Sequence, residues 1–202
     1  MKNFKINTFF ALFLLISTNI LYSQSKFGIE AYYGMNNVYE PNQTNLKHIR
    51  IGGFYEIYED FEIKLDFASE KFRISNDFLG DESGVDFIRS TIHLDYNLSA
   101  LLDREYYYNK FNLHTHVGIG YTIAKSSYLT TGKDEIVNVI LGINPRYRIF
   151  NGFYLSADAS FVINPSQHYN WDGSLTYSGK PNPITGLYYT ISGGILIKFN
   201  DR

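Results

Sequence analysis

The chain has 202 residues, no cysteine, and 18 Lys plus Arg against 20 Asp plus Glu, which gives a formal net charge of −2. The lack of cysteine excludes disulfides, thiolate chemistry and the acylated cysteine of a lipoprotein, and the balanced charge gives no indication of nucleic-acid binding. The 18 Tyr, 16 Phe and 16 Gly are typical of a chain rich in strands and turns.

The N-terminal segment reads MKNFKINTFFALFLLISTNILYSQ. Two lysines precede a short apolar run, and small and polar residues follow as far as Ser23. This order is typical of a secretory signal peptide, and the run is too short for a membrane-spanning helix. We expect residues 1–23 to be a signal peptide and residues 24–202 to form the mature protein. A buried amphipathic helix is the alternative.

The rest of the chain shows the two-residue periodicity of β-strands in eight segments, and helical periodicity nowhere. These segments are at about residues 26–34, 47–58, 61–73, 85–98, 109–124, 136–150, 153–164 and 184–199. Lys71 and Arg73 break the apolar alternation of the third segment, so that strand is expected to leave the bilayer there. Pro145 cannot donate to a strand ladder, so we expect a bulge or local fraying at that residue.

The connections between these segments alternate in character. YED, SALLDREYYY and NG follow the even-numbered segments, and NG is a two-residue hairpin signal. Longer polar connections follow the odd-numbered ones: MNNVYEPNQTNL, SNDFLGDESG, KSSYLTTGKDE and PSQHYNWDGSLTYSGKPNP. Short turns at one end and long loops at the other indicate an all-β, eight-stranded antiparallel up-and-down transmembrane β-barrel, with both mature termini on the periplasmic side.

One face of every predicted strand is apolar and carries no charge, as in FEIKLDF at residues 61–67. A Lys or Arg facing lipid at the bilayer midplane costs about 2 to 4 kcal/mol, so such a face suits a lipid-facing wall. Its Phe, Tyr, Leu and Ile are too bulky for the inside of an eight-stranded barrel. The glycines gather on the opposite face, at Gly28, Gly34, Gly52, Gly118, Gly120, Gly142 and Gly194. We therefore expect the apolar face to point outward. A soluble periplasmic lipocalin-like binder, with the faces exchanged, is the alternative.

The inward face carries six basic and six acidic residues, a balance that predicts a neutralising network which closes the lumen. They are Arg50, Lys64, Arg89, Arg146, Arg148 and Lys198, against Glu30, Glu56, Glu62, Asp66, Asp95 and Asp158. A selective pore would more often show an excess of one sign. A narrow solute conduit is the alternative.

Three histidines and an aspartate fall on the inward face of the fourth and fifth segments. If the hairpin register places His93 opposite His114 or His116, these imidazoles and Asp95 form a possible zinc or nickel ligand set. The favoured interpretation is a polar network without metal, in which the histidines bridge Asp95 and nearby hydroxyl groups. No cofactor is expected.

The last segment contains GGILIKF, in which Gly193, Ile195, Ile197 and Phe199 look like the C-terminal signal that the barrel-assembly machinery recognises. With its eight-strand pattern, the mature chain resembles the small outer-membrane barrels typified by the OmpA transmembrane domain and OmpX, and Bacteroidetes-type outer-membrane barrels. The family usually ends on that aromatic, whereas Asn200, Asp201 and Arg202 follow here. The resemblance implies a porin-like fold in the Gram-negative outer membrane, in contact with lipid and lipopolysaccharide, and a monomer.

The longest connection holds the residues that most invite a functional interpretation. Ser166, His168 and Asp172 could serve an enzyme at the rim that modifies lipid A or phospholipid, but nothing in the sequence shelters or activates them, so a flexible loop is favoured and no catalytic residue is assigned. Tyr169, Trp171 and Tyr177 suit contact with a partner or glycan.

Three acidic residues of another long connection, Asp77, Asp81 and Glu82, match no calcium motif and are expected to be solvated. The leading hypothesis for the whole chain is a non-enzymatic outer-membrane barrel whose extracellular loops contact surface partners or which supports the integrity of the envelope.

Overall fold

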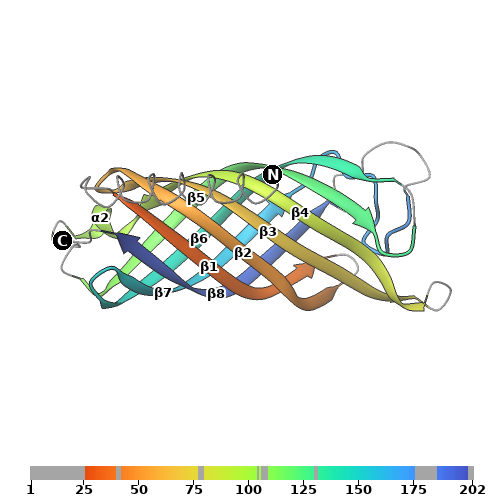
Figure 1. The fold of residues 1–202 in the computed structure, drawn as a ribbon, viewed down its shortest axis with the longest axis horizontal. Helices are drawn as coiled ribbons and strands as arrows, with labels where there is room; N and C mark the ends of the chain where they lie inside the picture. Colours follow the sequence, from red (N-terminus) through yellow and green to blue (C-terminus); the bar gives the residue numbers. More distant parts are fainter. Residues whose placement is uncertain are drawn as a thin grey trace, which may run out of the picture.

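The structure is a computed structural model that describes residues 26–39, 42–76, 80–103, 105, 109–129, 132–175 and 186–199. The expected signal peptide lies outside this part of the chain. The strands are β1 (Phe27–Val38), β2 (Gln43–Tyr58), β3 (Phe61–Asn76), β4 (Gly80–Asn97), β5 (Phe111–Ser126), β6 (Asp134–Phe150), β7 (Phe153–Ile163) and β8 (Leu187–Phe199), with a short helix α2 (Ser99–Leu102) between β4 and β5 (Figure 1).

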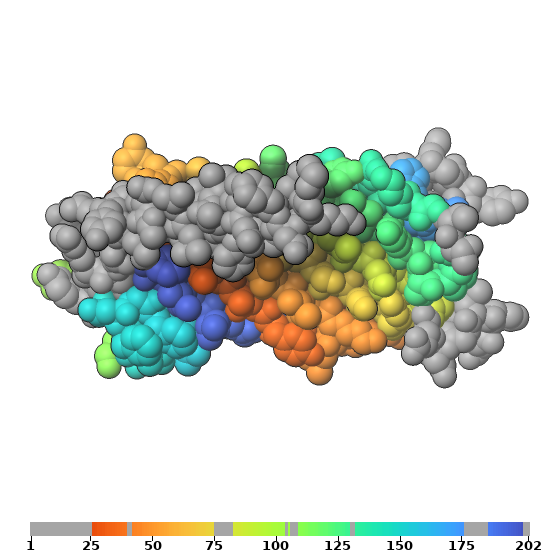
Figure 2. Space-filling view, in the orientation of Figure 1, coloured from red at the N-terminus to blue at the C-terminus, as the bar shows by residue number. Residues whose placement is uncertain are grey.

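The eight strands form one closed barrel in which each strand pairs with its neighbours in sequence and β8 pairs with β1. The closing pair is antiparallel and begins with Phe27 beside Phe199. The strands run obliquely to the long axis of the barrel (Figure 1), and the space-filling view shows the first strand, in red, beside the last, in blue (Figure 2). The expected eight-stranded antiparallel architecture is confirmed.

The two ends of the barrel differ. At one end, here called the short-turn end, two residues join β2 to β3 and two join β6 to β7, where Gly152 has a φ of +78°. This end also holds the start of β1, the end of β8 and α2 (Figure 1). The opposite end, here called the long-loop end, includes the connection between β7 and β8. Within the described chain, no helix is long and apolar enough to span a membrane.

Two of the expected long connections are mostly strand. β1 continues to Val38 and β2 begins at Gln43, while β3 ends at Asn76 and β4 begins at Gly80. The polar residues that suggested a loop are used in pairing, as where the Asn37 side chain donates a hydrogen bond to the Thr44 hydroxyl. Polar sequence therefore did not end these strands. Helical periodicity is absent from the sequence, and α2 is too short to show it: the helix has four residues, and the Asn97 side chain accepts a hydrogen bond from the Ser99 backbone N–H at 3.0 Å where the chain turns.

The apolar face points outward, as expected. Along β3, exposed and buried residues alternate through the whole of residues 61–67. Leu65 and Phe67 are 49% and 51% exposed, whereas Lys64 and Asp66 are 3% and 1% exposed. A closed barrel with a charge-filled interior is thus confirmed.

Pro145 produces no bulge. Ile143 pairs with Ala159 and Arg146 with Ser156, so β6 and β7 keep one register across the proline. The pairing is interrupted between those two points, because proline has no N–H to donate, and the Ser156 hydroxyl donates to the Pro145 carbonyl at 3.2 Å instead. The expected disturbance is therefore a local gap in the ladder.

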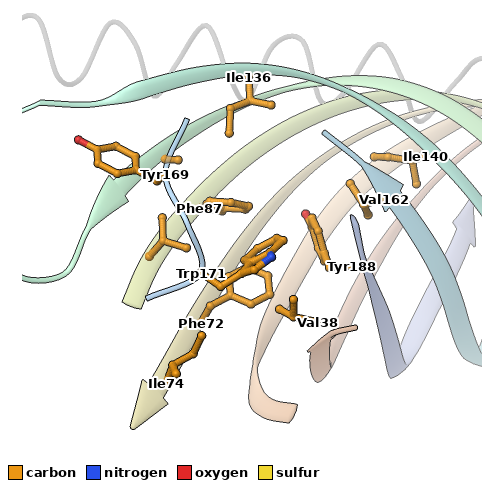
Figure 3. Packing of buried hydrophobic residues seen from close by; sticks show 12 residues of the cluster. Val38, Phe72, Ile74, Phe87, Ile136, Ile140, Val162, Tyr169, Trp171 and Tyr188 are labelled. Atoms are coloured by element: carbon orange, nitrogen blue, oxygen red, sulfur yellow. The ribbon is translucent and has the colours of Figure 1, made fainter. Parts of the chain in front are cut away.

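Toward the long-loop end the wall carries charged side chains on its outer face and apolar side chains on its inner face, the reverse of the pattern along residues 61–67. There Lys71 is exposed and Arg73 points outward, while Phe72 and Ile74, which alternate with them along β3, are buried. The inward residues form an apolar cluster inside the barrel (Figure 3), made of Val38, Phe72, Ile74, Val85, Phe87, Ala124, Ile136, Ile140, Val162, Tyr169, Trp171 and Tyr188. The lumen thus has a polar part near the short-turn end and an apolar part at the long-loop end.

Candidate functional site

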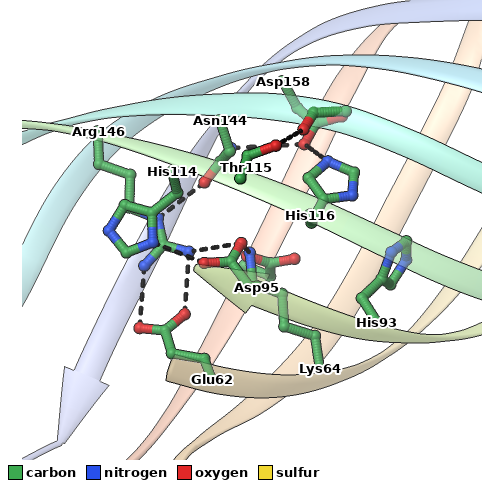
Figure 4. A network of polar contacts seen from close by, with 12 residues as sticks. Glu62, Lys64, His93, Asp95, His114, Thr115, His116, Asn144, Arg146 and Asp158 are labelled. Carbon is green, nitrogen blue, oxygen red and sulfur yellow. Dashed lines mark hydrogen bonds and ion pairs between the residues drawn. The ribbon is translucent and has the colours of Figure 1, made fainter. Parts of the chain in front are cut away.

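The polar part of the lumen is organised around a guanidinium that reaches across the barrel (Figure 4). Arg146 of β6 donates two hydrogen bonds to Glu62 of β3, at 3.1 and 3.0 Å. Its Nη2 also lies 3.4 Å from Asp95 Oδ2, and the Lys64 ammonium lies 2.7 Å from the same oxygen. All four side chains are nearly inaccessible to solvent, so each charge depends on its neighbours for compensation.

A second guanidinium, Arg50 of β2, joins further carboxylates to the network. Its Nη2 lies 3.1 Å from Asp158 of β7 and 3.8 Å from Glu30 of β1, and its Nε lies 3.8 Å from Asp66 of β3. The guanidinium carbon is 4.3 Å from the centre of the Tyr32 ring, a cation–π contact. One side chain therefore links four strands across the lumen.

Asn144 ties the two parts of the network together. Its side-chain amide donates to the Tyr32 hydroxyl at 3.0 Å and to Ser156 at 2.9 Å, and its carbonyl accepts from Arg146 Nε at 2.7 Å. These hydrogen bonds give the Asn144 amide partners on β1, β6 and β7. The central lumen is accordingly filled with side chains from β1 through β7.

Every one of the chain's five histidines lies beside a carboxylate. The pairs and their nitrogen–oxygen distances are His48 and Glu70, 3.2 Å; His93 and Asp66, 2.8 Å; His114 and Asp95, 2.6 Å; His116 and Asp158, 3.1 Å; and His168 and Asp134, 2.9 Å. The histidines are thus distributed among five different carboxylates.

The register of the β4–β5 hairpin differs from the one that the histidine cluster required. His93 lies opposite Gly118, Asp95 opposite His116 and Asn97 opposite His114. The physical reason lies in the turn: Leu98 N–H donates to the Leu113 carbonyl at 2.8 Å and α2 follows at once, which shifts β5 relative to the assumed pairing. His93 and His116 still touch, with ring centres 4.9 Å apart.

The four-residue ligand set that was the alternative to a polar network does not converge on one point, because its histidines face separate carboxylates. A different trio, Glu62, Asp95 and His114, offers ligand atoms within 4.8 Å of one another. Arg146 and Lys64 already neutralise those two carboxylates, so a metal ion would have to displace both cations. The arrangement fits an internal ion-pair network better than a metal site.

The twelve residues expected in the network do not all share one environment. Arg148 and Lys198 are only half-buried near the short-turn end, where Lys198 pairs with Glu56. Arg89 lies apart from the central group and binds Glu70 at 3.0 Å. Sequence reasoning missed Glu70 and His48, both fully buried, although Glu70 continues the inward alternation of Glu62 and Asp66.

Tyr188 connects this second buried group to the apolar cluster. Its hydroxyl donates to Glu70 at 2.6 Å and accepts from Arg89 at 2.6 Å. Its ring packs against Phe72 and Trp171 at centroid distances of 5.2 and 5.6 Å (Figure 3). The same residue thus marks the boundary between the polar and apolar parts of the lumen.

The expected contact aromatics of the longest connection are not exposed. Tyr169 and Trp171 are 2% and 1% exposed, and the Trp171 ring lies 4.6 Å from Phe72 and 5.7 Å from Phe87. The described part of the connection, residues 164–175, places these two rings in the barrel end, where they bury the inward apolar side chains. Tyr177 lies outside the described residues, so the prediction of an aromatic contact surface is wrong for the two described residues.

Ser166, His168 and Asp172 do not form a catalytic arrangement. The Asp134 carboxylate accepts hydrogen bonds from the backbone N–H and from Nδ1 of His168, at 2.6 and 2.9 Å. The Asp172 carboxylate accepts a hydrogen bond from the Ser174 hydroxyl. These contacts fix the described part of the loop in place, so the expectation of an exposed flexible loop is wrong for residues 167–171. Asp77 lies outside the described residues, and the side chains of Asp81 and Glu82 are likewise outside the description.

No protein-family model and no curated protein sequence matches the chain. Among solved structures it is similar to Neisserial surface protein A (NspA), with 12% identity, a TM-score of 0.57, and coverage of 88% of this chain and 98% of that one. A major outer membrane protein from Thermus thermophilus gives 13% identity, a TM-score of 0.54 and coverage of 86% and 98%.

The N-terminal β-barrel domain of Pseudomonas aeruginosa OprF gives 10% identity, a TM-score of 0.50 and coverage of 85% and 97%. At these identities the similarity concerns the fold. This chain has the fold of the small eight-stranded outer-membrane β-barrels.

Proposed function

We propose that this protein is an integral outer-membrane β-barrel with no enzymatic activity, whose lumen is closed and whose long-loop end contacts surface partners or supports the integrity of the envelope. The observation that carries the proposal is the combination of an apolar outer wall with a lumen occupied by paired charges. The sealed long-loop end supports a structural or contact role over transport.

The outer wall supports the membrane location. Large apolar side chains on all eight strands are exposed, among them Ile51 at 57%, Ile119 at 64% and Val137 at 59%. Soluble monomers rarely expose continuous apolar patches larger than a few hundred Å². A lipocalin-like binder would instead turn these residues inward, and the inward positions hold Arg, Lys, Asp and Glu. Protein found in the soluble periplasmic fraction would contradict the proposal.

The topology supports an orientation and a route of assembly. On this proposal residues 1–23 direct export and are removed, and residues 24–202 are inserted by the barrel-assembly machinery through the final strand. The short-turn end, where β1 begins and β8 ends, faces the periplasm. The protein functions as a monomer in contact with lipid and lipopolysaccharide, because the closed wall leaves no strand edge for a partner.

Electrical recording tests closure directly. Purified protein that shows a heat-dependent gel shift, the mark of a folded barrel, is inserted into planar bilayers beside a large trimeric porin as positive control. We expect no stable single-channel current, because Arg50 and Arg146 span the lumen and Trp171 seals its end. Large, stable currents would refute closure and favour the narrow conduit.

The enzymatic alternative has its own measurement. Mass spectra of lipid A and phospholipids from cells with and without the gene should be identical. A mass change equal to one acyl chain or one head group, lost again in a His168→Ala variant, would overturn the non-enzymatic assignment.

A further inference from the structure

Basic side chains gather on one sector of the outer wall, just beyond the apolar belt toward the long-loop end. Lys71 of β3 pairs in register with Asp86 of β4, which pairs in turn with Lys125 of β5. On the other side, the register that pairs His48 with Glu70 places Lys47 of β2 next to Lys71. Arg73 lies one step further along β3. We call Lys47, Lys71, Arg73 and Lys125 the basic row.

The basic row lies directly above the apolar belt. One step toward the short-turn end, the same outward face carries Ile49, Ser69, Ile88 and Ile123 on β2 to β5. Ile49 and Ile88 are 52% and 58% exposed. In a membrane these isoleucines would contact acyl chains, so the basic row would lie at the level of the lipid head groups.

Two surface hollows open along the row. The first, of about 420 Å³, is lined by Lys47, Lys71 and Arg73 together with the apolar side chains of Leu46 and Ile49, and has no acidic residue in its described lining. The second, of about 370 Å³, extends on the other side of Arg73 to Lys125, with Ile88 and Ile123 as its apolar floor. Asp86, the partner of Arg73, also lines this second hollow, so the first is the more basic of the two. Each hollow therefore combines cations with the upper edge of the apolar belt.

The charge of the row is mostly uncompensated. Arg73 pairs with Asp86 at 2.6 Å, but no acidic side chain in the described chain lies within ion-pair distance of Lys47, Lys71 or Lys125. Lys47 and Lys71 lie side by side on neighbouring strands and repel one another, whereas Asp86 lies between Lys71 and Lys125. Lys133, at the same end, has an acidic partner: it forms an ion pair with Glu135, and this bond raises the pKa of Lys133. An anion at the basic row would replace repulsion with charge-assisted hydrogen bonds.

We propose that the basic row binds the phosphorylated head group of an outer-leaflet glycolipid of the lipid A class, whose acyl chains lie on the isoleucines below. This proposal rests on the proposed membrane location. The apolar floor favours a lipid over free phosphate, since an inorganic ion gains nothing from Ile49, Ile88 and Ile123. The open, outward position of both hollows suits a ligand that arrives laterally in the membrane.

Native mass spectrometry of the folded protein in a neutral detergent tests the site. The probes are lipid A with two phosphates, the same lipid after phosphatase treatment, and inorganic phosphate. A Lys47→Gln/Lys71→Gln/Lys125→Gln variant is compared with the wild type, and Lys133→Gln is the matched control, because it removes a lysine that is already paired. The gel shift on heating checks that every variant is folded.

The wild type should retain lipid A with two phosphates, and the triple variant should bind it on the order of a hundredfold more weakly, at roughly fivefold per lysine. The Lys133→Gln variant should bind as the wild type does. Equal retention of the dephosphorylated lipid, or unchanged binding by the triple variant, would overturn the proposal. Displacement by an equal concentration of inorganic phosphate would show an anion site and refute the lipid.

These outcomes are independent of the conductance test. If the barrel is folded and non-conducting but does not discriminate between the lipids, the basic row is not a lipid A site, and the proposal that the lumen is closed is unaffected. If the barrel conducts but still binds lipid A, the lumen is not closed, and the proposal of a lipid A site on the basic row is unaffected.

Discussion

Arg146 and Glu62 lie on β6 and β3, which are not neighbours in the barrel, and two hydrogen bonds of 3.1 and 3.0 Å join them across the lumen. A contact of this kind fixes the cross-section of the barrel in a way that ladder bonds between neighbouring strands do not. It also removes the space through which a solute would pass. Structural support and closure of the lumen are therefore two results of one interaction.

Replacing both partners of this pair should lower the free energy of unfolding by less than the two single replacements do together. Glu62→Met leaves a buried guanidinium with Asp95 as its remaining acidic partner, and Arg146→Met leaves a buried carboxylate, each at about 3 to 5 kcal/mol of unfolding free energy. The double variant should cost clearly less than the sum of the two. Urea unfolding in lipid vesicles gives the three values, and additive costs would show that the pair is not coupled.

The two faces of β3 should respond to substitution in opposite ways. Leu65→Arg places a charge on the middle of the apolar belt, at a cost of about 2 to 4 kcal/mol, and should reduce insertion into vesicles. Lys64→Met, one residue away, leaves the outer wall unchanged and removes a partner from Asp95, so it should lower the unfolding free energy without preventing insertion.

Sedimentation with vesicles measures insertion, and Leu65→Phe serves as the size control on the outer face. Insertion of Leu65→Arg at the wild-type level would contradict the lipid-facing assignment.

Much of this fold could be predicted from sequence because side-chain alternation is a local property of strands. In residues 61–67 the alternation alone shows which side chains share a face, and no information on the neighbouring strands is needed. The same logic would have found Glu70, which follows the inward alternation of Glu62 and Asp66. The strand ends were harder to predict, because Asn37 and Thr44 form cross-strand contacts although their types favour loops.

Register and loop packing depend on interactions that periodicity does not encode. His93 lies opposite Gly118 because of how the chain turns through α2, a property of the connection and not of either strand. The burial of Trp171 depends on the apolar side chains that β3 and β4 present inside the barrel end, far away in sequence. The assumed register of the histidine hairpin and the exposure of the loop aromatics were therefore the two points that the structure corrected.

Two adjacent glycines of β8 should differ sharply in their tolerance of alanine. A Cβ on Gly194 would lie 2.3 Å from the Ala31 carbonyl and 2.5 Å from the Tyr32 ring, whereas a Cβ on Gly193 meets nothing within 4 Å. Gly194→Ala should cost about 1 to 3 kcal/mol through overpacking. Gly193→Ala should be neutral or slightly stabilising, because it restricts the unfolded chain.

Unfolding midpoints of the two variants in the same vesicles provide the comparison. Equal midpoints would mean that Gly194 does not lie against the β1 side chains.

Trp171 is the only tryptophan in the chain, so its fluorescence reports directly on the seal of the long-loop end. In the wild type we expect emission typical of an apolar environment and weak quenching by acrylamide, since the indole is 1% exposed. Phe72→Ala removes the ring 4.6 Å away and should increase quenching, with a stability loss of up to about 3 to 5 kcal/mol. Part of that loss should appear as local opening of the loop.

Leu175→Ala is the matched control, because Leu175 lies in the same loop but is 59% exposed. Its quenching should equal that of the wild type. If the wild type is quenched as strongly as the protein in urea, the indole is open to solvent and the seal does not exist. If instead only Phe72→Ala gains quenching, the aromatic cluster holds the loop in the barrel end, and the closure of the lumen rests on both the ion pairs and this seal.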